Sequence, residues 1–78
     1  MKELFISPLC IDSRNLMEKE NFKEDYQDAE IIDITASMEN LKRFLQYRDH
    51  DPAFQEIKER GNIGIPCLII NKKEVSFL

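Results

Sequence analysis

The chain contains no tryptophan and only two glycines, two cysteines and one histidine, and these scarcities exclude several classes of protein. Two cysteines are too few for the disulfide framework of a small secreted domain. A structural zinc site takes about four ligands, so two cysteines and one histidine far apart in sequence argue against a metal site. The sequence also shows no internal repeat, linker or low-complexity segment.

Long hydrophobic runs and basic blocks are absent as well. No stretch approaches the roughly 18 apolar residues of a membrane span. The first apolar run is too short for a signal peptide and ends at Pro8. A net charge of −4 without a basic block argues against a nucleic-acid partner. We therefore expect a cytoplasmic protein whose partners include neither a membrane nor a nucleic acid.

The composition is that of a small globular domain. The chain has 78 residues, of which 42% are hydrophobic and 33% are charged. This length predicts a single domain over residues 1–78. A domain of this size buries only roughly 60% of the surface of its unfolded chain, so we expect a thin core.

The apolar pattern predicts strands that alternate with helices. The expected strands cover residues 2–7, 31–35, 63–70 and 75–78, and the expected helices cover residues 11–23, 38–48 and 52–60. The initial strand, helix and strand predict a parallel pair, and the turn over residues 71–74 predicts a final hairpin. The order β-α-β-α-α-β-β thus predicts an α/β fold with a mixed four-stranded sheet flanked by helices.

Polar and apolar residues mark where these helices begin and which side they bury. Ser37 can cap the helix that follows it, and Asp51 with Pro52 can begin the next one. Gly61 is expected to end that last helix. One apolar stripe of the second helix consists of Met38, Leu41, Phe44 and Leu45.

Cys10 follows a Ser-Pro turn at the point where the first helix is expected to begin. Free backbone N–H groups at a helix start favour the thiolate, the nucleophilic form of cysteine. Ser13, three residues on, can turn its hydroxyl toward the sulfur. The pattern predicts a Cys-x-x-Ser redox turn with Cys10 and Ser13 as catalytic residues. The alternative is a buried, inert Cys10 with Ser13 bonded to the backbone.

Pro66 interrupts the most apolar stretch of the chain, where a proline cannot donate to a sheet. Cys67 follows it and allows two interpretations. It is either a resolving thiol that forms a disulfide with Cys10 or a core residue of the strand. The alternation of side chains along a strand and the frequent burial of free cysteine favour the core interpretation.

These features together resemble the glutaredoxin branch of the thioredoxin-fold superfamily, above all small bacterial glutaredoxin-related proteins. The matching segments are Ser7-Pro8-Leu9-Cys10, residues 32–35, residues 41–45 and residues 61–67 with Gly64-Ile65-Pro66, and they extend over nearly the whole chain. The resemblance implies a thioredoxin-like fold that lacks its final helix. It also implies that the Ile65-Pro66 bond is cis and faces Cys10.

The function that this resemblance implies is thiol-disulfide exchange of the monothiol type, with no bound cofactor. Cys10 attacks a disulfide or a glutathionylated protein, and Ser13 stabilises the thiolate. Leu9, Ile65 and Pro66 are then expected to contact the substrate, and so is Arg14, whose charge can meet an anionic substrate. Glutathione is the candidate co-substrate.

The chain also differs from these relatives. Ser13 stands where many of them have a second cysteine, and Ser7 stands where glutaredoxins often have a glutathione-binding lysine. The Gly-Gly pair and acidic residue that hold the other end of glutathione are absent. A sheet face left open by the missing helix would allow a homodimer.

Two other functions therefore compete with the first. One is a binding or adaptor module on the same fold without catalytic turnover. The other is an arsenate-reductase-like enzyme, because Cys10-Ile11-Asp12-Ser13-Arg14-Asn15 resembles a stretch of one such family, although those proteins are much longer. His50, near the end of the second helix, is expected to be a solvated cation rather than a metal ligand or a base.

Overall fold

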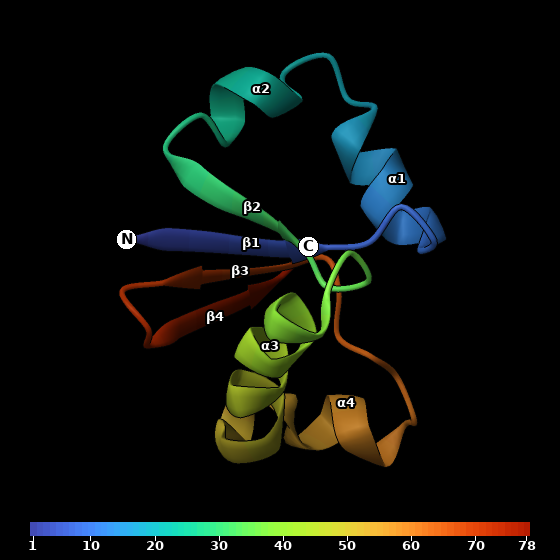
Figure 1. Ribbon diagram of the computed structural model, residues 1–78, viewed down its shortest axis with the longest axis vertical. Helices are drawn as coiled ribbons and strands as arrows, with labels where there is room; N and C mark the ends of the chain where they lie inside the picture. The colour runs from blue at the N-terminus through green and yellow to red at the C-terminus, as the bar shows by residue number, and fades with distance from the viewer.

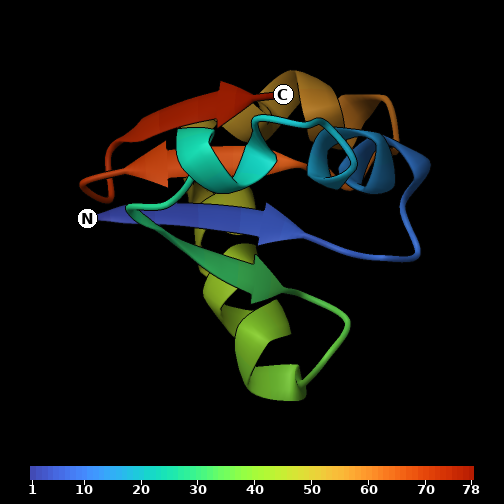
Figure 2. The same ribbon diagram turned by 90° about the horizontal axis from the view of Figure 1, so that it is seen from above.

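The computed structural model describes all residues 1–78, and its centre is one mixed sheet of four strands in the order β2-β1-β3-β4 (Figure 2). The strands are β1 (Lys2–Ile6), β2 (Ala29–Asp33), β3 (Cys67–Ile70) and β4 (Glu74–Phe77). β1 pairs parallel with β2 and antiparallel with β3, which forms a hairpin with β4. The expected α/β class with a mixed four-stranded sheet is confirmed.

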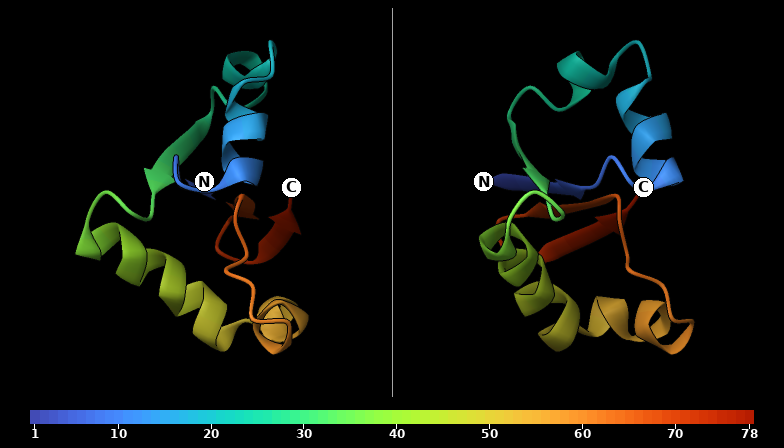
Figure 3. Two further views of the ribbon diagram at one scale, coloured as in Figure 1. Left: turned by 90° about the vertical axis from the view of Figure 1, so that its right-hand side faces the viewer. Right: turned by 45° about the vertical axis from the view of Figure 1, so that its right-hand side comes forward.

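Helices cover both faces of this sheet (Figures 1 and 3). One face carries α1 (Ile11–Met17) and α2 (Phe22–Asp25), and the other carries α3 (Met38–His50), the 3-10 turn η1 (Pro52–Phe54) and α4 (Gln55–Glu59). None of these helices has the length and apolar character needed to cross a membrane.

The alternation of side chains along β1 divides the core into two clusters. Leu4 and Ile6 pack with Leu16 of α1 on one face. Phe5 points to the opposite face, where a larger cluster contains Phe44 of α3. The remaining members of this larger cluster are Ile32, Ile34, Phe54, Cys67 and Ile69. β1, one of the two central strands, thus packs against both helical layers.

The predicted starts of the helices on the α3 face are confirmed. The Ser37 hydroxyl accepts a hydrogen bond from the Asn40 N–H at 3.1 Å. The Asp51 carboxylate accepts one from the Ala53 N–H at 2.9 Å. The predicted apolar stripe of α3 is wrong at Met38, which is 70% exposed because it lies in the first turn of the helix, beyond the edge of the core.

The prediction of one helix over residues 11–23 is wrong. α1 ends at Met17, and a separate turn of helix, α2, begins at Phe22. Residues 18–21 offer no apolar side chain to the sheet, so nothing anchors a longer helix there. Phe22 instead packs against Tyr26, with ring centroids 5.3 Å apart, and both contact the smaller core cluster.

The strand boundaries also differ from the prediction, most clearly in β2, which runs over Ala29–Asp33, and at the start of β3. β2 ends at Asp33 because the Asp33 carboxylate accepts hydrogen bonds from both the N–H and the hydroxyl of Thr35, at 2.8 and 2.6 Å, which turns the chain. β3 begins only at Cys67, because Gly64 has a positive φ of 102° and Pro66 has no N–H to donate. Residues 63–66 therefore form a loop that leads into the sheet.

Candidate functional site

The turn that follows β1 holds Cys10 at the carboxyl end of that strand. The Cys10 N–H donates to the Ser7 carbonyl at 3.0 Å, and the Leu9 N–H donates to the Ser7 hydroxyl at 3.1 Å. That hydroxyl also bonds the Thr35 hydroxyl at 2.9 Å, which ties the turn to the end of β2. Cys10 itself is half-buried and directly precedes α1, with an extended backbone.

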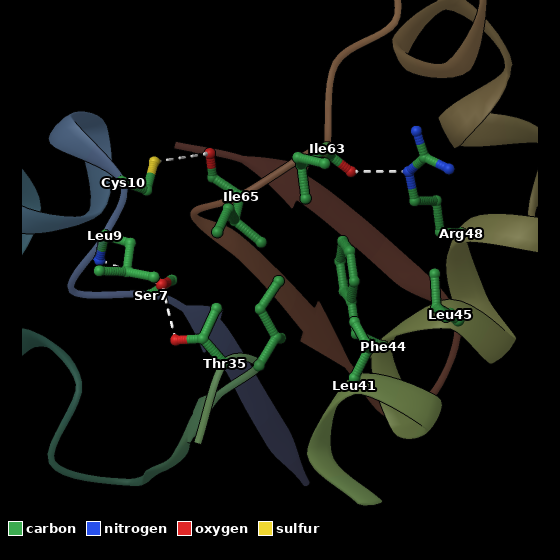
Figure 4. Close-up of a pocket in the computed structure, with 11 residues that line it drawn as sticks. Ser7, Leu9, Cys10, Thr35, Leu41, Phe44, Leu45, Arg48, Ile63 and Ile65 are labelled. Carbon is green, nitrogen blue, oxygen red and sulfur yellow. Dashed lines mark hydrogen bonds between the residues drawn. The ribbon is translucent and has the colours of Figure 1, made fainter. Parts of the chain in front are cut away.

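The Cys10 sulfur faces the loop that precedes β3 (Figure 4). Its thiol donates to the Ile65 carbonyl, with 3.9 Å between sulfur and oxygen. The Ile65-Pro66 peptide bond is cis, in agreement with what the resemblance implies. The Ile65 N–H donates no hydrogen bond within the chain. The Cys10 thiol and a backbone N–H without a partner in the chain therefore belong to two residues in contact.

The expected contact between Ser13 and the sulfur is absent. The Ser13 side chain is fully buried, and its hydroxyl accepts a hydrogen bond from the Ser7 N–H at 3.2 Å. That N–H is the last donor before the chain turns, so a short polar side chain in the first turn of α1 is the group that can reach it. Ser13 therefore fixes the turn that carries Cys10 and makes no bond to the sulfur.

Cys67 lies in the core, as the favoured interpretation predicted. Its side chain is fully buried among the larger cluster, and both cysteines are free thiols. Burial, and to a lesser extent the charge of Asp51, raise the pKa of the Cys67 thiol to about 12. A thiol that is sealed from solvent and resists ionisation is a poor nucleophile, so the structure favours a packing role over a resolving role.

An apolar groove of about 510 Å³ opens beside the sulfur (Figure 4). The turn after β1 contributes Leu9, which is 81% exposed and forms part of the rim. Leu41 and Phe44 of α3 form the floor, and Ile63 and Ile65 form the opposite wall. Leu9 and Ile65, two of the expected substrate contacts, therefore lie on either side of the same groove.

A second hollow of about 380 Å³ lies on the other side of Cys10. Its lining includes Pro66, Asp12 and the last two residues of the chain, and it contains no lysine or arginine. Cys10, Ile63 and Ile65 line both hollows. Cys10 therefore borders both hollows, so an extended chain that occupied both would pass it.

The charged residues at the site differ from those that the sequence suggested. Arg14 is exposed and lines neither hollow, so the structure does not place it at the site. Arg48, which the sequence pattern did not single out, lies at the far end of the groove. Its guanidinium donates to the carbonyls of Ile63 at 2.9 Å and Asn62 at 2.6 Å. No local signal in the sequence points to these two carbonyl groups, because they lie 15 and 14 residues away in another segment.

The titratable side chains do not gather into a metal centre. No group of three or more histidine, cysteine, aspartate or glutamate residues is arranged to bind a metal ion. The His50 ring lies 2.9 Å from the carbonyl oxygen of Gln46, one turn back in α3, and is exposed.

No model of a known protein family matches the chain. No solved structure shows a significant match to it either. A protein of Haemophilus influenzae, described as an uncharacterized protein, is 33% identical over 73 residues, which cover 92% of this chain and 81% of that protein. The aligned part therefore includes most of the sheet and most of the residues around Cys10. At this identity and coverage, the chain belongs to the same family as the uncharacterized Haemophilus influenzae protein.

Proposed function

We propose that the protein is a glutaredoxin-like thiol-disulfide oxidoreductase on a thioredoxin-like fold, with Cys10 as its nucleophile. The Cys10 thiolate attacks one sulfur of a disulfide, a new bond forms between the two sulfurs, and the old bond breaks. The departing thiolate leaves with the electron pair of that bond. The segment Ser7-Pro8-Leu9-Cys10 and the order of strands and helices support this proposal through their resemblance to glutaredoxin-related proteins.

The observation that carries the proposal is the position of the Cys10 sulfur. It lies 3.9 Å from the Ile65 carbonyl, on a half-buried residue between two hollows. A disulfide can approach it from solvent, and the unbonded Ile65 N–H can donate a hydrogen bond to the carbonyl of an extended substrate next to the reacting sulfur. Both features are what an attacking cysteine needs: access for a second molecule and a means of orienting it.

The mixed disulfide then requires a second thiol to complete a cycle. Cys67 is fully buried and Ser13 has no sulfur, so no other thiol of the chain is exposed beside Cys10. A thiol from solution therefore attacks the mixed disulfide and releases Cys10 as thiolate. Glutathione is one such thiol, and it serves here as the reductant of the second step.

The test is the reduction of a peptide disulfide by 2-mercaptoethanol or by glutathione, with and without the protein. We expect the protein to accelerate the reaction, the Cys67→Ala variant to keep this activity, and the Cys10→Ser variant to lose it. Mass spectrometry should find the substrate thiol attached to Cys10. Equal rates with and without the protein, for both reductants, would exclude the proposed activity.

A non-catalytic binding module is the second candidate, favoured by the absence of an accessible second thiol beside Cys10. In that case the same surface holds an extended peptide without any exchange of disulfides. Binding of a cysteine-free peptide, measured by calorimetry, would persist in the Cys10→Ser variant while the reductase assay shows no turnover. A protein that turns over peptide disulfides through Cys10 rules this candidate out.

A further inference from the structure

The groove beside Cys10 is much more apolar than a site for a charged thiol compound would be. Aliphatic and aromatic side chains from three parts of the chain form its walls, among them Leu9, Leu41, Phe44 and Ile63. Two of these apolar side chains remain largely in contact with solvent, Leu9 at 81% and Ile63 at 54% exposure. Exposed apolar residues that line a concave surface beside a reactive group are typical of a binding site for an apolar ligand.

The charges around the sulfur point away from an anionic ligand. Arg48 is the only cation that lines the groove, and two of its nitrogens already donate to the carbonyls of Asn62 and Ile63. The second hollow has the carboxylate of Asp12 and no cation, and the whole chain carries a net charge of −4. The carboxylates of glutathione would therefore meet no dedicated positive partner here.

The backbone at the site selects for a peptide rather than for a small apolar thiol. The Ile65 N–H has no hydrogen-bond partner within the chain, and the Ile65 carbonyl meets only the thiol of Cys10. An extended peptide can satisfy both groups with its own backbone, as an added strand does at a sheet edge. Its cysteine then lies at Cys10, and a neighbouring side chain reaches the groove.

We propose that the groove makes Cys10 selective for peptide disulfides in which a large apolar residue stands next to the cysteine. This specificity rests on the proposed thiol-disulfide exchange. The attack is the one described above: the Cys10 thiolate bonds to the peptide sulfur, and the former partner of that sulfur leaves as a thiolate. The apolar side chain fills the groove during this step and speeds the reaction because its burial removes apolar surface from water.

The test uses short peptides with blocked ends, each carrying its cysteine as a mixed disulfide with 5-thio-2-nitrobenzoate. The residue next to the cysteine is leucine, phenylalanine, alanine or glutamate. The released coloured thiolate gives a second-order rate constant for each peptide, and the leaving group is the same throughout. We expect leucine and phenylalanine to react about tenfold faster than alanine, because burial of one such side chain contributes about 1.5 kcal/mol. The glutamate peptide and the corresponding glutathione disulfide should be slower than the leucine peptide.

Matched variants test whether the preference for leucine over alanine depends on the groove or on a general change in the protein. The exposed rim residues Leu9 and Ile63 can be changed to serine together, and we expect the ratio of leucine to alanine rates to fall from about ten to below three. Ile31→Ser is the control, because Ile31 is 46% exposed on β2 and lines neither hollow. This variant should keep the full ratio.

The same experiment distinguishes failure of the selectivity from failure of the proposed exchange activity. Equal rates for all peptides, or a glutathione disulfide that reacts faster than the leucine peptide, would overturn the selectivity and leave the exchange activity standing. A protein that releases no coloured thiolate from any disulfide would overturn the proposed function and the selectivity together.

Discussion

The hydroxyl of Tyr47 donates a hydrogen bond of 2.6 Å to a carboxylate oxygen of Glu3, which is buried in β1. The other oxygen of Glu3 accepts a bond of 2.8 Å from Arg43, whose guanidinium also binds Glu30. Both oxygens of a nearly inaccessible carboxylate are thus satisfied by side chains of α3. Because β1 leads to Cys10 and α3 forms the floor of the groove, this cluster joins the strand that carries the cysteine to the helix beneath the groove.

Removal of the Tyr47 hydroxyl should destabilise the protein. Tyr47→Phe leaves one oxygen of Glu3 without its donor, so we expect the free energy of unfolding to fall by about 1–2 kcal/mol. Glu3→Gln replaces the acceptor charge and should cost about 1–3 kcal/mol. Urea unfolding followed by circular dichroism measures both. The control is Glu74→Gln in the edge strand β4, which is exposed and should change little. A Tyr47→Phe protein as stable as the parent would contradict this account.

Stability should also fall at alkaline pH. Burial and the bond to Glu3 raise the pKa of Tyr47 to about 12, and burial raises that of Cys67 to about 12. In the unfolded chain these groups ionise near pH 10 and near pH 8.5–9. Their contribution is therefore fully present below pH 8.5–9 and is lost as the pH rises toward 12, by at most about 1.4 kcal/mol per pH unit for each group.

The Cys67→Ala variant tests how much of this loss of stability at alkaline pH comes from the Cys67 thiol. Urea unfolding at pH 7, 8, 9, 10 and 11, with a reductant present, should show the free energy of unfolding of the parent chain declining above pH 9. The variant lacks the buried thiol, so its decline should begin about one pH unit later, where tyrosine ionises. Identical slopes in the two proteins would show that the Cys67 thiol does not titrate as described.

The two cysteines should differ sharply in their reaction with iodoacetamide. Cys10 is half-buried at the groove and Cys67 is fully buried. In the folded protein we expect alkylation at Cys10 alone, and at Cys67 only after unfolding in urea, because reagent must reach the sulfur. Peptide mass spectrometry after brief labelling identifies the modified residue. Labelling of Cys67 in the native state at a rate similar to that of Cys10 would mean that the core opens readily.

Strong local patterns made most of the fold predictable from the sequence. The caps at Ser37 and Asp51 use short polar side chains whose preferred bonds are local, so both predictions hold in the structure. The apolar run of β1 and the turn at Asn71 and Lys72, both with positive φ, likewise define a buried strand and a hairpin. The length of α1 was not predictable, because Glu18-Lys19-Glu20 favour a continued helix by propensity, whereas the lack of an apolar side chain facing the sheet ends the helix at Met17.

The candidate site shows the same limit. The position of Cys10 in its turn follows from adjacent residues, whereas its contact with Ile65, 55 residues away, was expected only through the resemblance to glutaredoxin-related proteins. The three-residue spacing suggests a contact between Ser13 and the sulfur. In the structure the Ser13 hydroxyl instead accepts a hydrogen bond from the Ser7 N–H, which has no other acceptor. The role of Arg48 depends on two carbonyl groups 14 and 15 residues away. Such long-range contacts leave no mark in a single sequence.

Gly64→Ala should disturb both the fold and the site. Gly64 has a φ of 102°, and a Cβ there would lie 3.0 Å from the Phe54 ring and 3.1 Å from Ile57. The left-handed backbone and the crowding together should cost about 1–3 kcal/mol in the free energy of unfolding. Because Gly64 immediately precedes Ile65, we also expect slower alkylation or slower disulfide exchange at Cys10.

Gly61→Ala is the matched control for this last change. Gly61 also has a positive φ, 72°, but a Cβ there meets nothing within 4 Å. Gly61→Ala should therefore lower the free energy of unfolding only through the unfavourable backbone conformation, by about 1 kcal/mol. The reactivity of Cys10 should not change. The difference between the two alanine variants, measured by urea unfolding, isolates the contact with Phe54 from the conformational preference of glycine. If both variants lose the same stability and the same reactivity, the ring of Phe54 does not position the loop that carries Ile65.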